Sequence, residues 1–163
     1  MAAENDTAGD SAMRVMAIDF GEKRVGIALS ASMETADLAD PGAALALPSR
    51  TIERTTDRRL VYTLAALARE EEVGVLVLGE PRDLEGRAGE AAERVRRFAA
   101  KLEKASGLPV HLVEETLTTV AAAERLGGPA RKGKGGPADG RHDAVAAQIL
   151  LQEALDRGLA AGR

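Results

Sequence analysis

The sequence predicts one α/β domain, a layered fold in which helices flank a mixed central sheet. Short apolar runs bounded by glycine, typical of buried strands, alternate with longer segments whose apolar residues recur at helical spacing. The 163 residues suit a single domain. Hydrophobic residues make up 45% of the chain and charged residues 29%, the composition of an ordinary globular protein.

The first half of the chain predicts a hairpin, a further strand and a helix. Arg14–Phe20 is a short apolar run that ends in an acid and Gly21, so we expect a buried strand. A tight turn, GEKR, leads into a second strand over 25–30, and a third is expected around 43–47. Leucines at helical spacing predict a helix over 55–71 with one buried face.

The second half alternates strands and helices. The run VGVLVL at 73–78 is apolar at nearly every position, which is typical of a strand covered on both faces. A helix is expected over 88–105; its basic side, between Arg94 and Lys104, is interpreted as a solvated face. The remaining expected elements are a strand at 110–113, a short helix at 120–126, a glycine-rich loop at 127–140 and a last helix at 143–155.

Composition bounds the function and the domain limits. Residues 1–12 are expected to form a disordered acidic tail, 13–157 the folded domain and 158–163 a C-terminal tail. With no cysteine, thiol chemistry and Cys-ligated metals are excluded. No signal peptide or membrane span is recognisable, so a cytoplasmic protein is expected. Aromatic residues are 2% of the chain, too few for the stacking platforms of single-strand binders.

Acidic residues stand at the ends of several predicted elements. Asp19 ends the first strand, Glu114 and Glu115 end the 110–113 strand, and Asp143 opens the last helix. Taken singly, each is equally explained as a solvated strand end or a helix cap. Strand alternation aims only one of the two glutamates at a given site. Together they predict a cluster of carboxylates that needs a hard cation, Mg²⁺ or Mn²⁺, of the kind that serves phosphodiester hydrolysis.

Four segments in order resemble the YqgF family, also called RuvX. They are AIDFGEKRVGIALS (17–30), VLVLGEPRDLEG (75–86), VEETLTTVAA (113–122) and HDAVAAQILLQEAL (142–155). These small bacterial proteins belong to the ribonuclease-H-like superfamily and are associated with Holliday-junction resolution or pre-16S rRNA processing. The resemblance spans nearly all of 15–155, and it implies a ribonuclease-H-like sheet in which the strand of Asp19 lies beside the strand ending at Gly79.

The resemblance also implies site residues. Asp19, Glu115 and Asp143 would be the catalytic acids and would hold one or two Mg²⁺ or Mn²⁺ ions. Basic residues of the first turn and of the glycine-rich loop would contact phosphates: Lys23, Arg24, Arg131, Lys132, Lys134 and Arg141. A solvated, flexible charge cluster is the alternative for the loop.

The chain departs from the family pattern at three positions. Thr116 stands where the family usually has arginine, which removes a guanidinium near the expected metal site. Glu114 replaces an aspartate, and Glu80 stands where an apolar residue is usual. Glu80 and Glu114 therefore compete with Glu115 as candidate ligands.

The function expected from these residues is metal-dependent phosphodiester hydrolysis in the 5′-end processing of pre-16S rRNA. One alternative is a Holliday junction resolvase acting on branched DNA, which requires two sites related by symmetry. Another is a non-catalytic, ribosome-associated module that binds nucleic acid. An actin-like ATPase is excluded because it needs two such domains. We expect a monomer or a weak homodimer that has no membrane partner.

Overall fold

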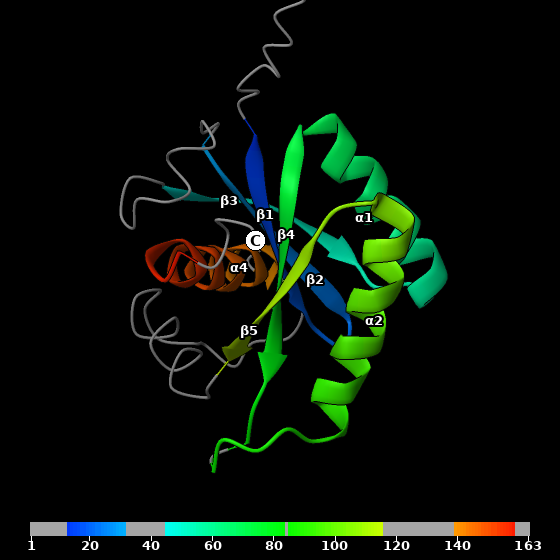
Figure 1. The fold of residues 1–163 in the computed structure, drawn as a ribbon, viewed down its shortest axis with the longest axis vertical. Helices are drawn as coiled ribbons and strands as arrows, with labels where there is room; N and C mark the ends of the chain where they lie inside the picture. The colour runs from blue at the N-terminus through cyan, green and yellow to red at the C-terminus, as the bar shows by residue number, and fades with distance from the viewer. Residues whose placement is uncertain (1–12, 32–44, 84, 116–138, 159–163) are drawn as a thin grey trace, which may run out of the picture.

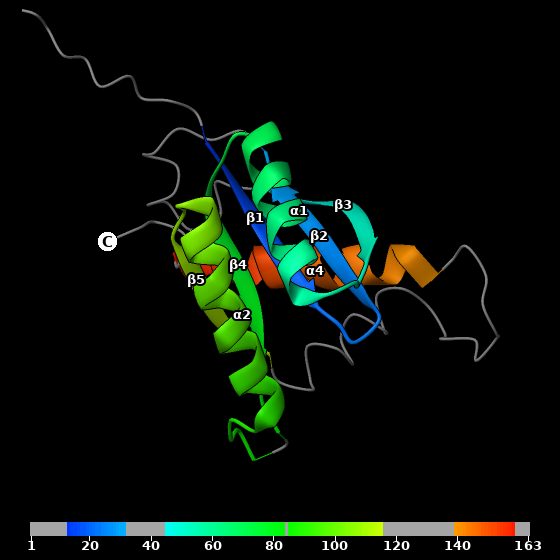
Figure 2. The same ribbon diagram turned by 90° about the vertical axis from the view of Figure 1, so that its right-hand side faces the viewer.

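The computed structural model describes residues 13–31, 45–83, 85–115 and 139–158. They form a five-stranded sheet with the order β3-β2-β1-β4-β5. Helices α1 and α2 cover one face of this sheet and α4 crosses the other (Figures 1 and 2). The predicted single α/β domain, with a mixed sheet between layers of helices, is confirmed.

The sheet is antiparallel on one side and parallel on the other. β2 pairs antiparallel with both β1 and β3, whereas β4 pairs parallel with β1 and β5. The carboxyl ends of β1, β4 and β5 therefore lie at one edge, and the strand of Asp19 lies beside the strand that contains Gly79, as expected. The strands are β1 (Arg14–Phe20), β2 (Arg24–Ser30), β3 (Ala46–Glu53), β4 (Val73–Pro81) and β5 (Val110–Glu115).

The helices are α1 (Asp57–Glu70), α2 (Glu90–Ser106) and α4 (Asp139–Asp156). Thr56 caps α1 because its side chain accepts a hydrogen bond from the backbone N–H of Arg59. Gly107 ends α2 in the left-handed conformation, with φ of 72°. Among the described residues, no helix is long and apolar enough to span a membrane.

Several predicted boundaries were wrong. The third strand is Ala46–Glu53 rather than 43–47, because it is a sheet edge whose polar residues face solvent and so leave no apolar pattern. β4 and β5 run on through Pro81 and Glu115, since these residues pair with each other. Helix α4 begins at Asp139, inside the expected loop, so Asp143 lies in its second turn rather than at its start.

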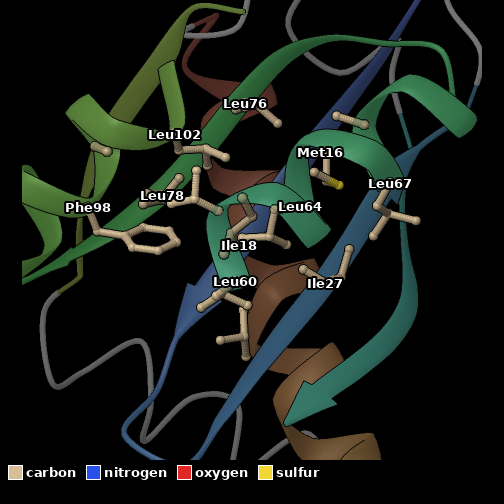
Figure 3. Packing of buried hydrophobic residues seen from close by; sticks show 14 of the residues in the cluster. Met16, Ile18, Ile27, Leu60, Leu64, Leu67, Leu76, Leu78, Phe98 and Leu102 are labelled. Carbon is tan, nitrogen blue, oxygen red and sulfur yellow. The ribbon is translucent and has the colours of Figure 1, made fainter. Parts of the chain in front are cut away.

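Alternation along the strands gives each face of the sheet its own core. Met16, Ile18, Leu76 and Leu78 point toward α1 and α2, where they meet the residues labelled in Figure 3, among them Phe98. The intervening residues, such as Val15, Ala17, Val75 and Val77, pack under α4. Burying one large apolar side chain fully contributes about 1.5–3 kcal/mol. The continuous apolar run at 73–78 thus has its expected cause, burial on both faces.

Helix α4 is fastened to the far side of the sheet by two glutamines. Gln148 donates a hydrogen bond from Nε2 to the carbonyl of Ala46 at 3.0 Å, and the Ala46 N–H donates to Oε1 of Gln152 at 3.1 Å. These bonds satisfy backbone groups at the start of β3. They also fix the position of α4 across β2 and β3. The position of Asp143 relative to the sheet follows from it.

Candidate active site on one face of the sheet

Asp19 and Glu115 lie on the same face of the sheet, the face that α4 covers. On β1 this face carries Val15 and Ala17, so alternation continues it to Asp19. On β5 it carries Val113, and alternation continues it to Glu115. The two acids therefore extend buried apolar rows at the carboxyl edge of the sheet.

Two glycines beside Asp19 make room for its acidic neighbours. Gly26 is the partner of Asp19 across the β1–β2 ladder, and a Cβ atom there would overlap the backbone carbonyl of Asp143. Gly79 follows the last registered pair of β1 and β4, and a Cβ atom there would overlap the carboxylate of Glu115. The missing side chains let α4 and the Glu115 carboxylate settle against the sheet on either side of Asp19.

The electrostatics confirm that these groups are close. Burial, and after it the charge of Asp143, raises the pKa of Asp19 from 3.8 to about 6. Burial, followed by the charges of Asp19 and Glu153, raises the pKa of Glu115 from 4.5 to about 7. Asp19 and Glu115 are thus harder to ionise, first because they are buried and second because other carboxylates lie near them. The structure brings together the three acids that the sequence predicted.

Glu153 is an acid of this cluster that sequence reasoning missed. It lies on α4, is partly buried and forms an ion pair with Arg157. Its charge acts on Glu115 from across the face that α4 covers. It comes ten positions after Asp143, about 2.8 turns at 3.6 residues per turn, which leaves the two residues about 80° apart around the helix, so the sequence spacing gave no clear signal.

Glu80 and Glu114 belong to the opposite face. Glu80 is only 4% exposed, and its carboxylate forms ion pairs with Arg96 of α2 and, at 2.6 Å, with Arg82. Arg82 also pairs with the exposed Glu114 at 2.8 Å. Two arginines therefore neutralise Glu80 beneath α2, on the far side of the sheet from Asp19. As alternatives to Glu115, both Glu80 and Glu114 are on the wrong face.

Arg54 holds the turn that follows Asp19. Its backbone N–H donates to the carbonyl of Lys23 at 2.9 Å, and its guanidinium donates to the carbonyl of Gly21 at 3.2 Å. The guanidinium also lies 4.2 Å from the ring centroid of Phe20, whose ring in turn lies 4.4 Å from that of Phe98. The turn is therefore anchored from the α2 side of the sheet.

The structure describes only some of the basic residues that are expected to contact phosphates. Lys23 is exposed in the turn, and alternation from Gly26 places the half-buried Arg24 on the face of Asp19. Arg141 lies within α4, but its side chain is not described. Arg131, Lys132 and Lys134 lie outside the described residues, as do Thr116, the 120–126 helix, the loop up to residue 138 and the tails 1–12 and 159–163.

The donor set of the acidic cluster fits a hard divalent cation. Among the described residues, no three His, Cys, Asp or Glu side chains are already arranged to hold a metal ion. Burial and, second, repulsion between neighbouring carboxylates nevertheless raise the pKa values of Asp19 and Glu115. A cation with affinity for oxygen ligands would relieve that repulsion.

Comparison with known proteins shows which proteins the chain is similar to. The family model "RuvX: Holliday junction resolvase" matches residues 13–157. Proteins named "Putative pre-16S rRNA nuclease" are similar to the chain. That of Maridesulfovibrio salexigens is 40% identical over 70% of this chain and 78% of its own. That of Syntrophus aciditrophicus is 39% identical over 88% and 89%, and that of Streptomyces coelicolor 37% identical over 98% and 92%.

Among solved structures, an Aquifex aeolicus Ppx/GppA family member matches 71% of this chain and 41% of its own. The TM-score is 0.38 and the identity 18%, a likeness too low to support any conclusion.

Proposed function

Because the chain belongs to the RuvX family, we propose that it is a nuclease that hydrolyses phosphodiester bonds at the Asp19 face of its sheet. The observation that carries this proposal is the convergence of Asp19, Glu115 and Asp143 from three separate elements. Buried carboxylates that repel one another lower stability, so a protein that contains them has a use for their charge. Its ribonuclease-H-like fold puts that charge at the carboxyl edge of parallel strands, where α/β sheets bind ligands.

The three acids would hold Mg²⁺ or Mn²⁺. A bound divalent ion supplies charge stabilisation to the attacking and leaving oxygens of a phosphodiester. In this role Asp19 would be the central ligand, since the other two acids lie on either side of it. Because Gly26 and Gly79 have no side chains, Asp143 and Glu115 can lie close to Asp19.

The nucleic acid substrate that we propose is precursor 16S rRNA, cut in the maturation of its 5′ end. The names of the relatives from three bacteria support this choice. Lys23 and Arg24, next to the acidic cluster, would contact backbone phosphates near the scissile bond. We place Arg131, Lys132, Lys134 and Arg141 in the same role. The compartment that follows from such a substrate in bacteria is the cytoplasm.

The family description favours a second candidate, resolution of a four-way DNA junction. That reaction cuts two strands symmetrically, so it requires two copies of this chain on one junction. Processing of rRNA requires only one. A monomer or weak homodimer therefore fits RNA processing, whereas a stable dimer on the substrate favours resolution.

The test is cleavage of a labelled precursor rRNA fragment and of a synthetic four-way DNA junction, each with Mg²⁺ or Mn²⁺. The proposal expects cleavage to disappear in Asp19→Asn and in Glu115→Gln. Glu114→Gln is the matched control, because it removes the same charge from the next residue of the same strand but from the opposite face.

The preferred substrate decides between the two candidates. Full activity in Asp19→Asn contradicts the proposed chemistry. Binding without cleavage of either substrate by the wild-type protein identifies a non-catalytic module.

A further inference from the structure

A basic groove lies between α1 and α2, on the face of the sheet opposite the acidic cluster. It has a volume of about 490 Å³, within the range of ligand-binding pockets. Among the described residues, three cations and no acid line it. The lining residues are Arg58, Val61, Tyr62, Lys101, Lys104 and Ala105.

The cations of this groove lack internal partners. Within the part of the chain that the structure describes, no ion pair joins Arg58, Lys101 or Lys104 to an acid. By contrast, Arg96 of α2 pairs with Glu80, and Arg97, one turn before Lys101 on the same helix, pairs with Glu93. Like charges gathered in a groove without counter-charges produce a field that attracts polyanions.

Tyr62 adds an aromatic surface beside these charges. Its side chain is 61% exposed, although Val61 next to it is buried in the core. A ring that is held by its helix and open to solvent can stack on one base. One tyrosine is far from an extended stacking platform, so the groove would bind mainly phosphates and add a single stacked base.

The groove connects with the acidic cluster around the sheet edge. Arg54 contacts Lys23 and Gly21, in the turn that follows Asp19, and Arg58 comes four residues after Arg54 in the first turn of α1. On the other side, the ring of Phe20 contacts Phe98, which precedes Lys101 by three residues on α2. A strand that leaves the site past Lys23 therefore meets cations on its way to the groove.

We propose that this groove binds a single-stranded segment of the RNA whose scissile phosphate lies at Asp19, through Arg58, Lys101 and Lys104 on phosphates and Tyr62 on one base. The inference rests on the proposed function for its substrate. It assigns a second contact region, outside the site of cleavage, that favours substrates with a single-stranded extension. The solvated helix face expected from the sequence then becomes, in part, a binding surface.

The experiment is fluorescence anisotropy of labelled single-stranded RNA with EDTA, where no metal-dependent cleavage occurs. Oligonucleotides of about 4 and about 12 nucleotides are used, both within the range of roughly 4–16 nucleotides that single-strand-binding folds cover. The double variant Lys101→Ala/Lys104→Ala should bind the long strand roughly tenfold more weakly at low salt. Its slope of log K against log salt should fall by about 1.4, since each single-strand phosphate contact contributes about 0.7.

A matched control separates the groove from overall charge. Arg50→Ala/Arg87→Ala removes two exposed cations that lie on other elements and form ion pairs with Glu71 and Asp83, and should leave the long strand bound at nearly wild-type affinity. Tyr62→Ala should weaken binding by about tenfold through loss of one stack, whereas Tyr62→Phe should retain it. The 4-nucleotide strand has enough phosphates for the cations of the groove, so it should bind more weakly overall but rank the variants in the same order.

Three outcomes overturn the inference. The first is an equal loss of RNA affinity in the groove and control variants, and the second is no loss of affinity in either. The third is a polyglutamate peptide that competes for the groove as well as RNA of equal charge does. The last would identify an acidic protein as the occupant. Cleavage is scored separately with Asp19→Asn, so groove binding without cleavage refutes only the proposed function. Asp19-dependent cleavage with unaltered binding in the groove variants refutes only the groove.

Discussion

Removing the charge of Asp19 should make the protein more stable while it abolishes cleavage. Burial and the charge of Asp143 raise the pKa of Asp19 from 3.8 to about 6, so folding disfavours its ionised form. Asparagine has nearly the same shape and no charge. The Asp19→Asn variant therefore escapes a penalty that the wild-type protein bears at neutral pH.

The magnitude follows from proton linkage. A group whose pKa is raised on folding contributes most favourably to the free energy of unfolding at pH values below its pKa in the unfolded chain. That contribution is lost as the pH rises through the pKa of the folded protein. A rise of about two units, at about 1.4 kcal/mol per unit, corresponds to about 3 kcal/mol above pH 7. The same relation gives about half of this at pH 5 and about 0.5 kcal/mol at pH 4.

Urea unfolding of both proteins in EDTA, at pH 8, pH 5 and pH 4, measures this difference. Asp19→Asn should have the higher free energy of unfolding at pH 8, and the gap should close as the pH falls. Glu22→Gln serves as a control, because this exposed acid lies three residues away; its effect should stay within about 0.5 kcal/mol at each pH.

A variant no more stable than the wild type at pH 8 would refute the reasoning, since Asp19 would then be ionised in the folded protein without penalty. A gain that does not change with pH would assign the effect to packing rather than to charge.

Four further predictions follow from the same geometry. Mg²⁺ should raise the melting temperature of the wild-type protein but not of Asp19→Asn, with EDTA reversing the effect; equal shifts in thermal unfolding would place the ion elsewhere. Gly26→Ala should cost about 1–3 kcal/mol in urea unfolding, because its Cβ meets backbone, whereas Gly74→Ala, which meets the flexible Met13 side chain, should cost less. Glu80→Gln should lower stability by about 1–3 kcal/mol yet leave cleavage per folded molecule unchanged; lost cleavage would make Glu80 a ligand after all. Arg54→Ala should reduce cleavage and increase amide hydrogen exchange at 21–23, and unaltered exchange would show that the turn holds itself.

The success and failure of the predicted elements have a common physical cause. A strand covered on both faces must be apolar at nearly every position, so β1 and β4 are recognisable without a structure. The edge strand β3 is exposed to solvent and pairs through its backbone, so its side chains show no apolar pattern from which a strand could be predicted. The first turn of α4 contains Gly140 and was mistaken for loop, since its helical state comes from the longer helix that follows.

The choice between adjacent acids shows the same limit more sharply. Alternation along β5 predicts that Glu114 and Glu115 face opposite sides of the sheet, but it does not predict which of them faces α4. The register of β5 on β4 decides this, because it places Val113 in the core under α4 and so turns Glu115 toward Asp19. The same register turns Glu80 toward Arg96 instead.

The sequence by itself determined the fold class and the family, and it predicted an acidic cluster that contains Asp19 and Asp143. Burial leaves a periodic pattern along the chain, and the four motifs stand in a fixed order. Only the tertiary structure decided that Glu115 rather than Glu80 or Glu114 faces Asp19, that Glu153 joins the cluster, and that a basic groove lies behind it. Each of these depends on how elements far apart in the chain pack together, because proximity between side chains is set by register and helix docking, which no local pattern encodes.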